Sequence, residues 1–70
     1  MQFPSGPEMR RIVLEQHPTA AGRNESPNPD KRYARWRIWA DGEPLTAEYY
    51  TRQDNAWRAE YRAVSVGVVS

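Results

Sequence analysis

Residues 33–40 alternate between two kinds of side chain and end at Asp41-Gly42, and this pattern constrains the fold more than any other in the chain. One set of side chains is Ala34, Trp36, Ile38 and Ala40, and the other is Tyr33, Arg35, Arg37 and Trp39. A period of two is typical of a half-buried strand, with the first set facing the core. Because Asp-Gly often closes two-residue hairpins, the sequence predicts that the chain turns back here as an antiparallel pair.

Two further strands are predicted after this turn, over residues 45–49 and 57–63. Pro44 stands just before the first of them and indicates an edge position in the sheet. Asp54-Asn55 is a second turn signal, and the alternation resumes beyond it. A helix over residues 46–62 is the alternative, because Leu45, Tyr49, Gln53, Trp57 and Tyr61 also recur every four positions.

The N-terminal segment is predicted to be a short helix. Ser5 and Glu8 have the spacing of a capping box, with Pro7 in the first turn. Met9, Ile12, Val13 and Gln16 then share one helical face. Pro18 disfavours helical geometry at the residue before it, so the helix should end there. A strand over residues 11–15 is the alternative, because β-branched residues cluster in that stretch.

Residues 18–30 are predicted to form a flexible loop or linker, because they contain three prolines and almost nothing to bury. The last segment, residues 64–68, is predicted to be a strand, since its valines alternate with small residues. The large side chains change face after Ala63, which would require a bulge, a junction with a helix or burial on both faces.

Together these elements predict a single small α+β domain over residues 1–70, in which one short N-terminal helix packs on a small antiparallel three-stranded β-meander. The alternative is two helices with a short sheet. A chain of 70 residues builds only a marginal core, and the absence of Cys and the single His argue against disulfides and structural zinc. We therefore expect a homodimer more readily than a monomer, paired through an exposed end strand.

No apolar run approaches the roughly 18 residues of a membrane span, and the first seven residues lack the charged and apolar regions of a signal peptide. We expect a cytoplasmic protein that does not enter a membrane.

The candidate binding residues are Tyr33, Arg35, Arg37 and Trp39, which interleave cations with aromatic rings on one face of the predicted strand. Interface hot spots are enriched in these residue types. Residues 31–40 carry four basic side chains and no acid, although the whole chain has a net charge of +1. Residues 41–60 hold five acids against two arginines, and we expect these acids to neutralise the arginines in cross-strand pairs.

Catalytic, metal-binding and cofactor-binding residues are not predicted. There is no Cys nucleophile, the glycines are scattered, and His17 is expected to be a solvated side chain at a helix end. Glu48 and Glu60 could face each other across two strands, but ion pairing on a solvated face is the stronger interpretation. The sequence therefore does not indicate an enzyme.

The predicted function is that of a small non-enzymatic accessory or regulatory domain that binds a protein partner, or a second copy of itself, through this arginine and aromatic face. The alternative is a single-stranded nucleic-acid-binding protein that uses the same face, because alternating rings and cations also suit stacked bases and phosphates. The net charge of +1 makes nucleic acid the weaker interpretation.

Overall fold

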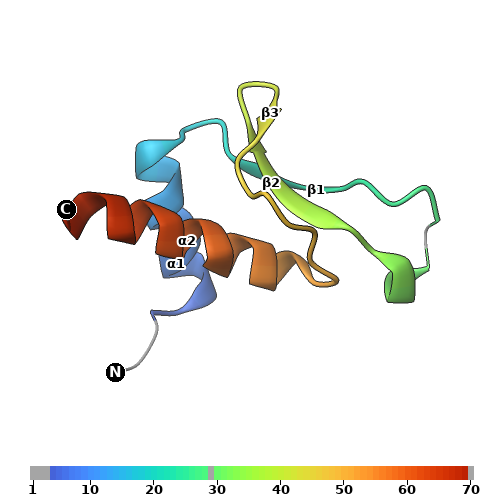
Figure 1. Cartoon of the computed structure of the whole chain (residues 1–70). Coiled ribbons are helices and arrows are strands. Elements are labelled where there is room, and N and C mark those ends of the chain that lie inside the picture. The colour runs from blue at the N-terminus through green and yellow to red at the C-terminus, as the bar shows by residue number, and fades with distance from the viewer. Residues whose placement is uncertain (1–3, 29, 70) are drawn as a thin grey trace.

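The computed structural model describes residues 4–28 and 30–69, which form an α+β fold with a helix at each end and a three-stranded antiparallel sheet between them. Its elements are α1 (Gly6–Gln16), β1 (Ala21–Asn24), the 3-10 turn η1 (Lys31–Tyr33), β2 (Trp36–Ala40), β3 (Glu43–Pro44) and α2 (Gln53–Val69). The two helices lie beside each other, and the hairpin and η1 extend away from them (Figure 1). This arrangement agrees with the predicted fold class and with its two-helix alternative.

The predicted N-terminal helix is confirmed as α1, and the strand alternative over residues 11–15 is wrong. The Ser5 hydroxyl accepts a hydrogen bond from the Glu8 N–H at 3.3 Å, and Pro7 lies in the first turn. The helix ends at Gln16, before Pro18, where the His17 N–H donates to the Val13 carbonyl at 2.8 Å. Nearby residues alone therefore determine where α1 begins and ends.

The strand predicted over residues 33–40 is confirmed from Trp36 to Ala40 as β2, and the predicted hairpin turn follows it. Ala34, Ile38 and Ala40 are buried and Trp36 is half-buried, as the alternation requires. Ala40 pairs with Glu43, and the two turn residues have positive φ angles, 54° at Asp41 and 78° at Gly42. Two left-handed residues in succession are what a type I′ hairpin needs, and Asp-Gly adopts them readily.

Residues 18–30 contain a strand that the loop prediction missed. β1 pairs antiparallel with β2, from Ala21 opposite Trp39 to Asn24 opposite Trp36. Gly22 faces α2 so closely that a Cβ would overlap the side-chain amide of Gln53. The strand carries almost no hydrophobic side chain, so it is held by its register with β2 and by this close approach. The mobility expected for the rest of residues 18–30 stays a prediction.

The predicted strands over residues 57–63 and 64–68 are wrong, because both segments belong to α2. The helical alternative over residues 46–62 is correct from Gln53 onward, and Asp54-Asn55 lies in the first helical turn. Ala56, Trp57 and Glu60 are buried, with Tyr61 and Val64 partly buried beside them. Burial from Ala56 to Val64 therefore follows the helical period. Because a helix does not alternate every two residues, the change from odd to even positions after Ala63 needs no bulge.

The segment predicted as a strand over residues 45–49 is also largely irregular. β3 spans only Glu43–Pro44 at the sheet edge, as Pro44 indicated, and Tyr50 then forms an isolated bridge with Trp36. An end strand over residues 64–68 does not exist, so the expected homodimer loses the edge through which it was to form.

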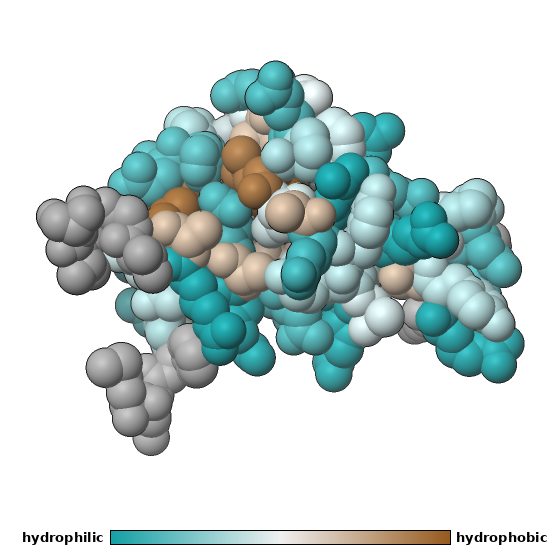
Figure 2. All heavy atoms as spheres, viewed as in Figure 1, coloured by the Kyte–Doolittle hydropathy of each residue, from teal (hydrophilic) through white to brown (hydrophobic). Residues whose placement is uncertain are grey.

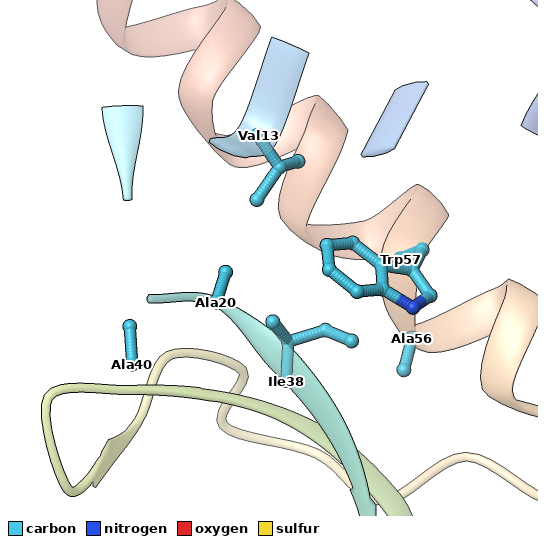
Figure 3. Packing of buried hydrophobic residues seen from close by; sticks show 6 residues of the cluster. All are labelled: Val13, Ala20, Ile38, Ala40, Ala56 and Trp57. Atoms are coloured by element: carbon cyan, nitrogen blue, oxygen red, sulfur yellow. The ribbon is translucent and has the colours of Figure 1, made fainter. Parts of the chain in front are cut away.

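The hydrophobic core lies between α2, α1 and the inner face of the sheet. Its buried members are Val13, Ala20, Ile38, Ala40, Ala56 and Trp57 (Figure 3). Ile38 of β2 points toward Ala56 and Trp57 of α2, with Val13 of α1 closing the group. In the view of Figure 2, hydrophobic residues gather over the helical part, and the end near η1 is largely hydrophilic. None of the helices in the described part of the chain is long and apolar enough to cross a membrane.

Candidate binding site on the open face of the sheet

The face of the sheet that points away from α2 carries a compact group of charged and aromatic side chains. We call it the open face and define it by Arg23, Glu25, Arg35, Arg37, Trp39 and Tyr49. Register places Arg23 directly opposite Arg37 and Ala21 opposite Trp39, so the side chains of β1 and β2 share this face. A backbone hydrogen bond of 2.8 Å from the Glu25 N–H to the Arg35 carbonyl continues the pairing beyond β1.

Glu25 binds two other side chains of the open face. Arg37 donates from Nε to Glu25 Oε2 at 2.6 Å and from Nη2 to Oε1 at 2.7 Å. The indole Nε1 of Trp39 donates to Glu25 Oε2 at 2.9 Å. The Arg37 and Glu25 side chains are only 16% and 18% exposed, so this bidentate pair is largely shielded from water.

The electrostatics of Glu25 follow from these contacts. The hydrogen bonds from Arg37 are the largest cause that lowers the pKa of Glu25, to about 2, with smaller contributions from Trp39 and from the charge of Arg23, while burial opposes them. The same pairing raises the pKa of Arg37. Glu25 is therefore an ionised carboxylate at neutral pH, and it answers the charge of Arg37.

The rings and guanidinium groups of the open face form a continuous series of cation–π contacts. Arg23 lies 4.7 Å from the centroid of the Trp39 ring, and Arg37 lies 5.4 Å from the same ring. Arg37 is also 4.5 Å from the centroid of Tyr49, and Arg35 is 5.8 Å from it. Such cation–π contacts hold long side chains in place. Arg23, Arg35 and Tyr49 are nevertheless exposed, and Tyr49 is half accessible to solvent.

The structure brings together three of the four predicted site residues. Arg35, Arg37 and Trp39 share the open face, but Arg37 is largely buried in its pair with Glu25. Tyr33 lies apart in η1, where the residue is 58% exposed and its ring centroid is 5.8 Å from the guanidinium group of Arg32. The strand begins only at Trp36, so the alternation does not carry Tyr33 onto the open face.

Sequence reasoning missed Arg23, Glu25 and Tyr49 as members of this face. Arg23 and Glu25 fall in the predicted loop, although Ala21, Arg23 and Glu25 do alternate, which was a usable signal. The expectation that acids in residues 41–60 neutralise the strand arginines is wrong for Arg37, whose carboxylate partner is Glu25. Within that acidic segment, Asp54 instead pairs with Arg10 at 2.9 Å.

A shallow hollow of about 300 Å³ lies beside the open face, between its Arg23 and Trp39 side chains and the hairpin turn at Asp41-Gly42. Thr19 borders it and fixes the turn, because its hydroxyl donates to the Asp41 carboxylate and accepts from the Asp41 N–H, both at 2.9 Å. Ala21 lines the hollow with a small side chain, so space remains above β1.

Two further residues weighed from the sequence lie elsewhere. His17 is not simply solvated, because its Nε2 is 3.5 Å from Oε1 of Glu60, which is buried at the contact of α1 and α2. Glu48 is exposed in the segment before α2 and does not face Glu60. That expected juxtaposition depended on the strand at residues 57–63. Among the described residues, no three His, Asp or Glu side chains are grouped so that they could hold a metal ion.

Comparison with protein-family models, with curated protein sequences and with solved structures found no match to this chain, so the site has to be interpreted from its own geometry.

Proposed function

We propose that this chain is a small accessory or regulatory domain that binds a protein partner on the open face of its sheet. The observation that carries the proposal is the series of cation–π contacts that joins Arg23, Trp39, Arg37, Tyr49 and Arg35, in which Glu25 holds Arg37 and Trp39 in place. Side chains already held in one arrangement lose little conformational entropy when a partner binds. Exposed Arg and Tyr beside a half-buried Trp are the residue types that dominate binding energy at protein interfaces.

The same geometry supports a protein partner over single-stranded nucleic acid. Bases bind such faces by stacking on open aromatic rings. Here Trp39 has two guanidinium groups within 5.4 Å of its centroid, and Tyr49 has two within 5.8 Å. A base would have to displace them.

Photo-crosslinking in a cell extract tests the proposal. A photoreactive phenylalanine replaces Tyr49 on the open face or, as the matched control, Tyr33 in η1. We expect a crosslinked protein from position 49 and none from position 33. Arg23→Ala with Arg35→Ala should abolish this product, whereas Arg32→Ala, next to Tyr33, should leave it unchanged. Equal crosslinking in the Arg23 and Arg35 double variant would contradict the proposal.

A titration with oligonucleotides tests the alternative. Quenching of tryptophan fluorescence by oligothymidylate, with an affinity that falls steeply as salt rises, would favour nucleic acid and overturn the protein-binding proposal. We expect no quenching at low salt.

A further inference from the structure

The outer edge of β1 has backbone groups that no described strand pairs with. In the sheet order β1-β2-β3, β1 is a terminal strand. The backbone N–H of Glu25 donates to the Arg35 carbonyl. Because hydrogen-bonded residues alternate along an antiparallel pair, the backbone N–H and C=O of Arg23 also point toward β2. The N–H and C=O groups of Gly22 and Asn24 consequently point outward from the sheet. An added strand would form its backbone hydrogen bonds with these groups.

The two edges of the sheet differ in how they are protected. β3 has two residues, one of them Pro44, and a short edge strand with a proline resists strand addition. β1 is twice as long and has no proline. Its one charged side chain, Arg23, is held over the Trp39 ring at 4.7 Å and so lies back across the open face. The β1 edge is therefore the one at which a strand can add.

Charge indicates what kind of strand fits. No carboxylate of the described residues lies within 4.0 Å of the guanidinium groups of Arg23 or Arg35, whereas Arg37 has Glu25. A second copy paired antiparallel so that Gly22 meets Asn24 would set Arg23 directly opposite its own equivalent. Like charges in directly opposed positions destabilise a pair of strands. An acidic strand would instead place a carboxylate there.

We propose that an extended acidic segment of the protein partner adds to β1 as a fourth strand. Its main chain bonds Gly22 and Asn24, one carboxylate lies beside Arg23, and a neighbouring side chain enters the hollow of about 300 Å³ above Ala21. This inference rests on the proposed function, because it assigns the mode by which the partner reaches the open face. Backbone bonds supply affinity in such an arrangement, and the side chains supply specificity.

The test is an NMR titration of the full chain with a synthetic probe, the acetylated and amidated peptide Thr-Glu-Val-Glu-Val-Glu-Thr. We expect the amide signals of Gly22 and Asn24 to move downfield and to gain protection from hydrogen exchange, together with a shift of the Trp39 indole. Two matched peptides complete the set, one with Lys in place of every Glu and one with N-methylated valines. Each control peptide should bind at least about tenfold more weakly, since one loses the negative charges and the other loses backbone hydrogen bonds to β1.

A change in the protein itself, rather than in the peptide, provides a further test. Sarcosine at position 22, introduced by chemical synthesis, removes one outward N–H without adding a Cβ near Gln53. It should weaken the acidic peptide while leaving the β1–β2 signals in place.

The outcomes separate this inference from the proposed function. Shifts at Arg35 and Tyr49 without shifts at Gly22 and Asn24 would overturn strand addition and leave the open face as a binding site. Shifts of the β1 amides on raising the concentration of the chain alone would assign the edge to a second copy and overturn the acidic partner. Equal binding of the Lys peptide, or no binding of the Glu peptide, would also overturn it.

Discussion

Glu25 and Arg37 form a bidentate ion pair, with both donor–acceptor distances between 2.6 and 2.7 Å, that joins the segment after β1 to the centre of β2. The two residues are 12 positions apart in the chain. The pair removes Arg37 from the set of exposed cations and orders the Trp39 ring through the same carboxylate. It therefore separates the open face into a fixed centre and the exposed Arg23, Arg35 and Tyr49.

The ion pair predicts a loss of stability in acid. The pKa of Glu25 is lowered from 4.5 to about 2, so its contribution to stability is present above about pH 4.5 and is lost as the pH falls toward 2. Glu25→Gln should flatten the decrease of unfolding free energy over this range, as measured by urea denaturation. Glu48→Gln, at an exposed position, is the control and should keep the slope of the wild type. An unchanged slope in Glu25→Gln would contradict the assignment.

Replacing Arg37 by lysine tests whether the fork of the guanidinium group is required. Lys keeps the charge but cannot donate two parallel hydrogen bonds to Glu25. Arg37→Lys should lower the Tm and change the fluorescence of Trp39. Arg32→Lys provides a matched control, because Arg32 also pairs with a carboxylate, Asp30, but its side chain is 80% exposed. The control should show almost no change in Tm, since exposed pairs contribute little.

The parts of the fold that could be predicted from the sequence are those fixed by nearby residues. The caps of α1 depend on Ser5, Glu8 and Pro18, and the hairpin depends on Asp41-Gly42 and the alternation before it. In each case the side chains that decide the structure lie within a few positions of the backbone they control. Arg35, Arg37 and Trp39 were placed on one face by the same local logic.

The parts that could not be predicted depend on tertiary contacts. β1 has no hydrophobic pattern and becomes a strand through its pairing with β2 and through the approach of Gln53 to Gly22. The aromatic and β-branched residues of α2 favour a strand by intrinsic propensity. The helix forms because it buries Ala56 and Trp57 against Ile38. Glu25 was missed as a site residue because its partner, Arg37, lies on a different element.

The contact at Gly22 predicts a local effect of alanine. In Gly22→Ala the new Cβ would force the Gln53 amide to move, and Gln53 Oε1 accepts a hydrogen bond of 3.2 Å from the Trp57 indole. We expect a loss of about 1 kcal/mol, the usual net contribution of one hydrogen bond, with a change in Trp57 fluorescence. Gly6→Ala, where nothing lies within 4 Å of the new Cβ, should not destabilise the fold. A neutral Gly22→Ala would show that Gln53 relocates without cost.

The buried Glu60 predicts the opposite pH response to that of Glu25. Its pKa is raised, chiefly by burial, while the nearby His17 acts in the other direction. The folded state thus favours the neutral carboxyl, and this stabilisation is present below about pH 4.5 and is lost as the pH rises through the folded pKa. Glu60→Gln stays neutral at every pH, so it should be more stable than the wild type at pH 8 and no more stable at pH 4. His17→Gln removes the side chain that acts in the other direction, so the loss of stability with rising pH should be steeper in this variant than in the wild type. Urea denaturation at both pH values measures each difference, and a Glu60→Gln variant less stable than the wild type at pH 8 would mean that the ionised carboxylate is needed between α1 and α2.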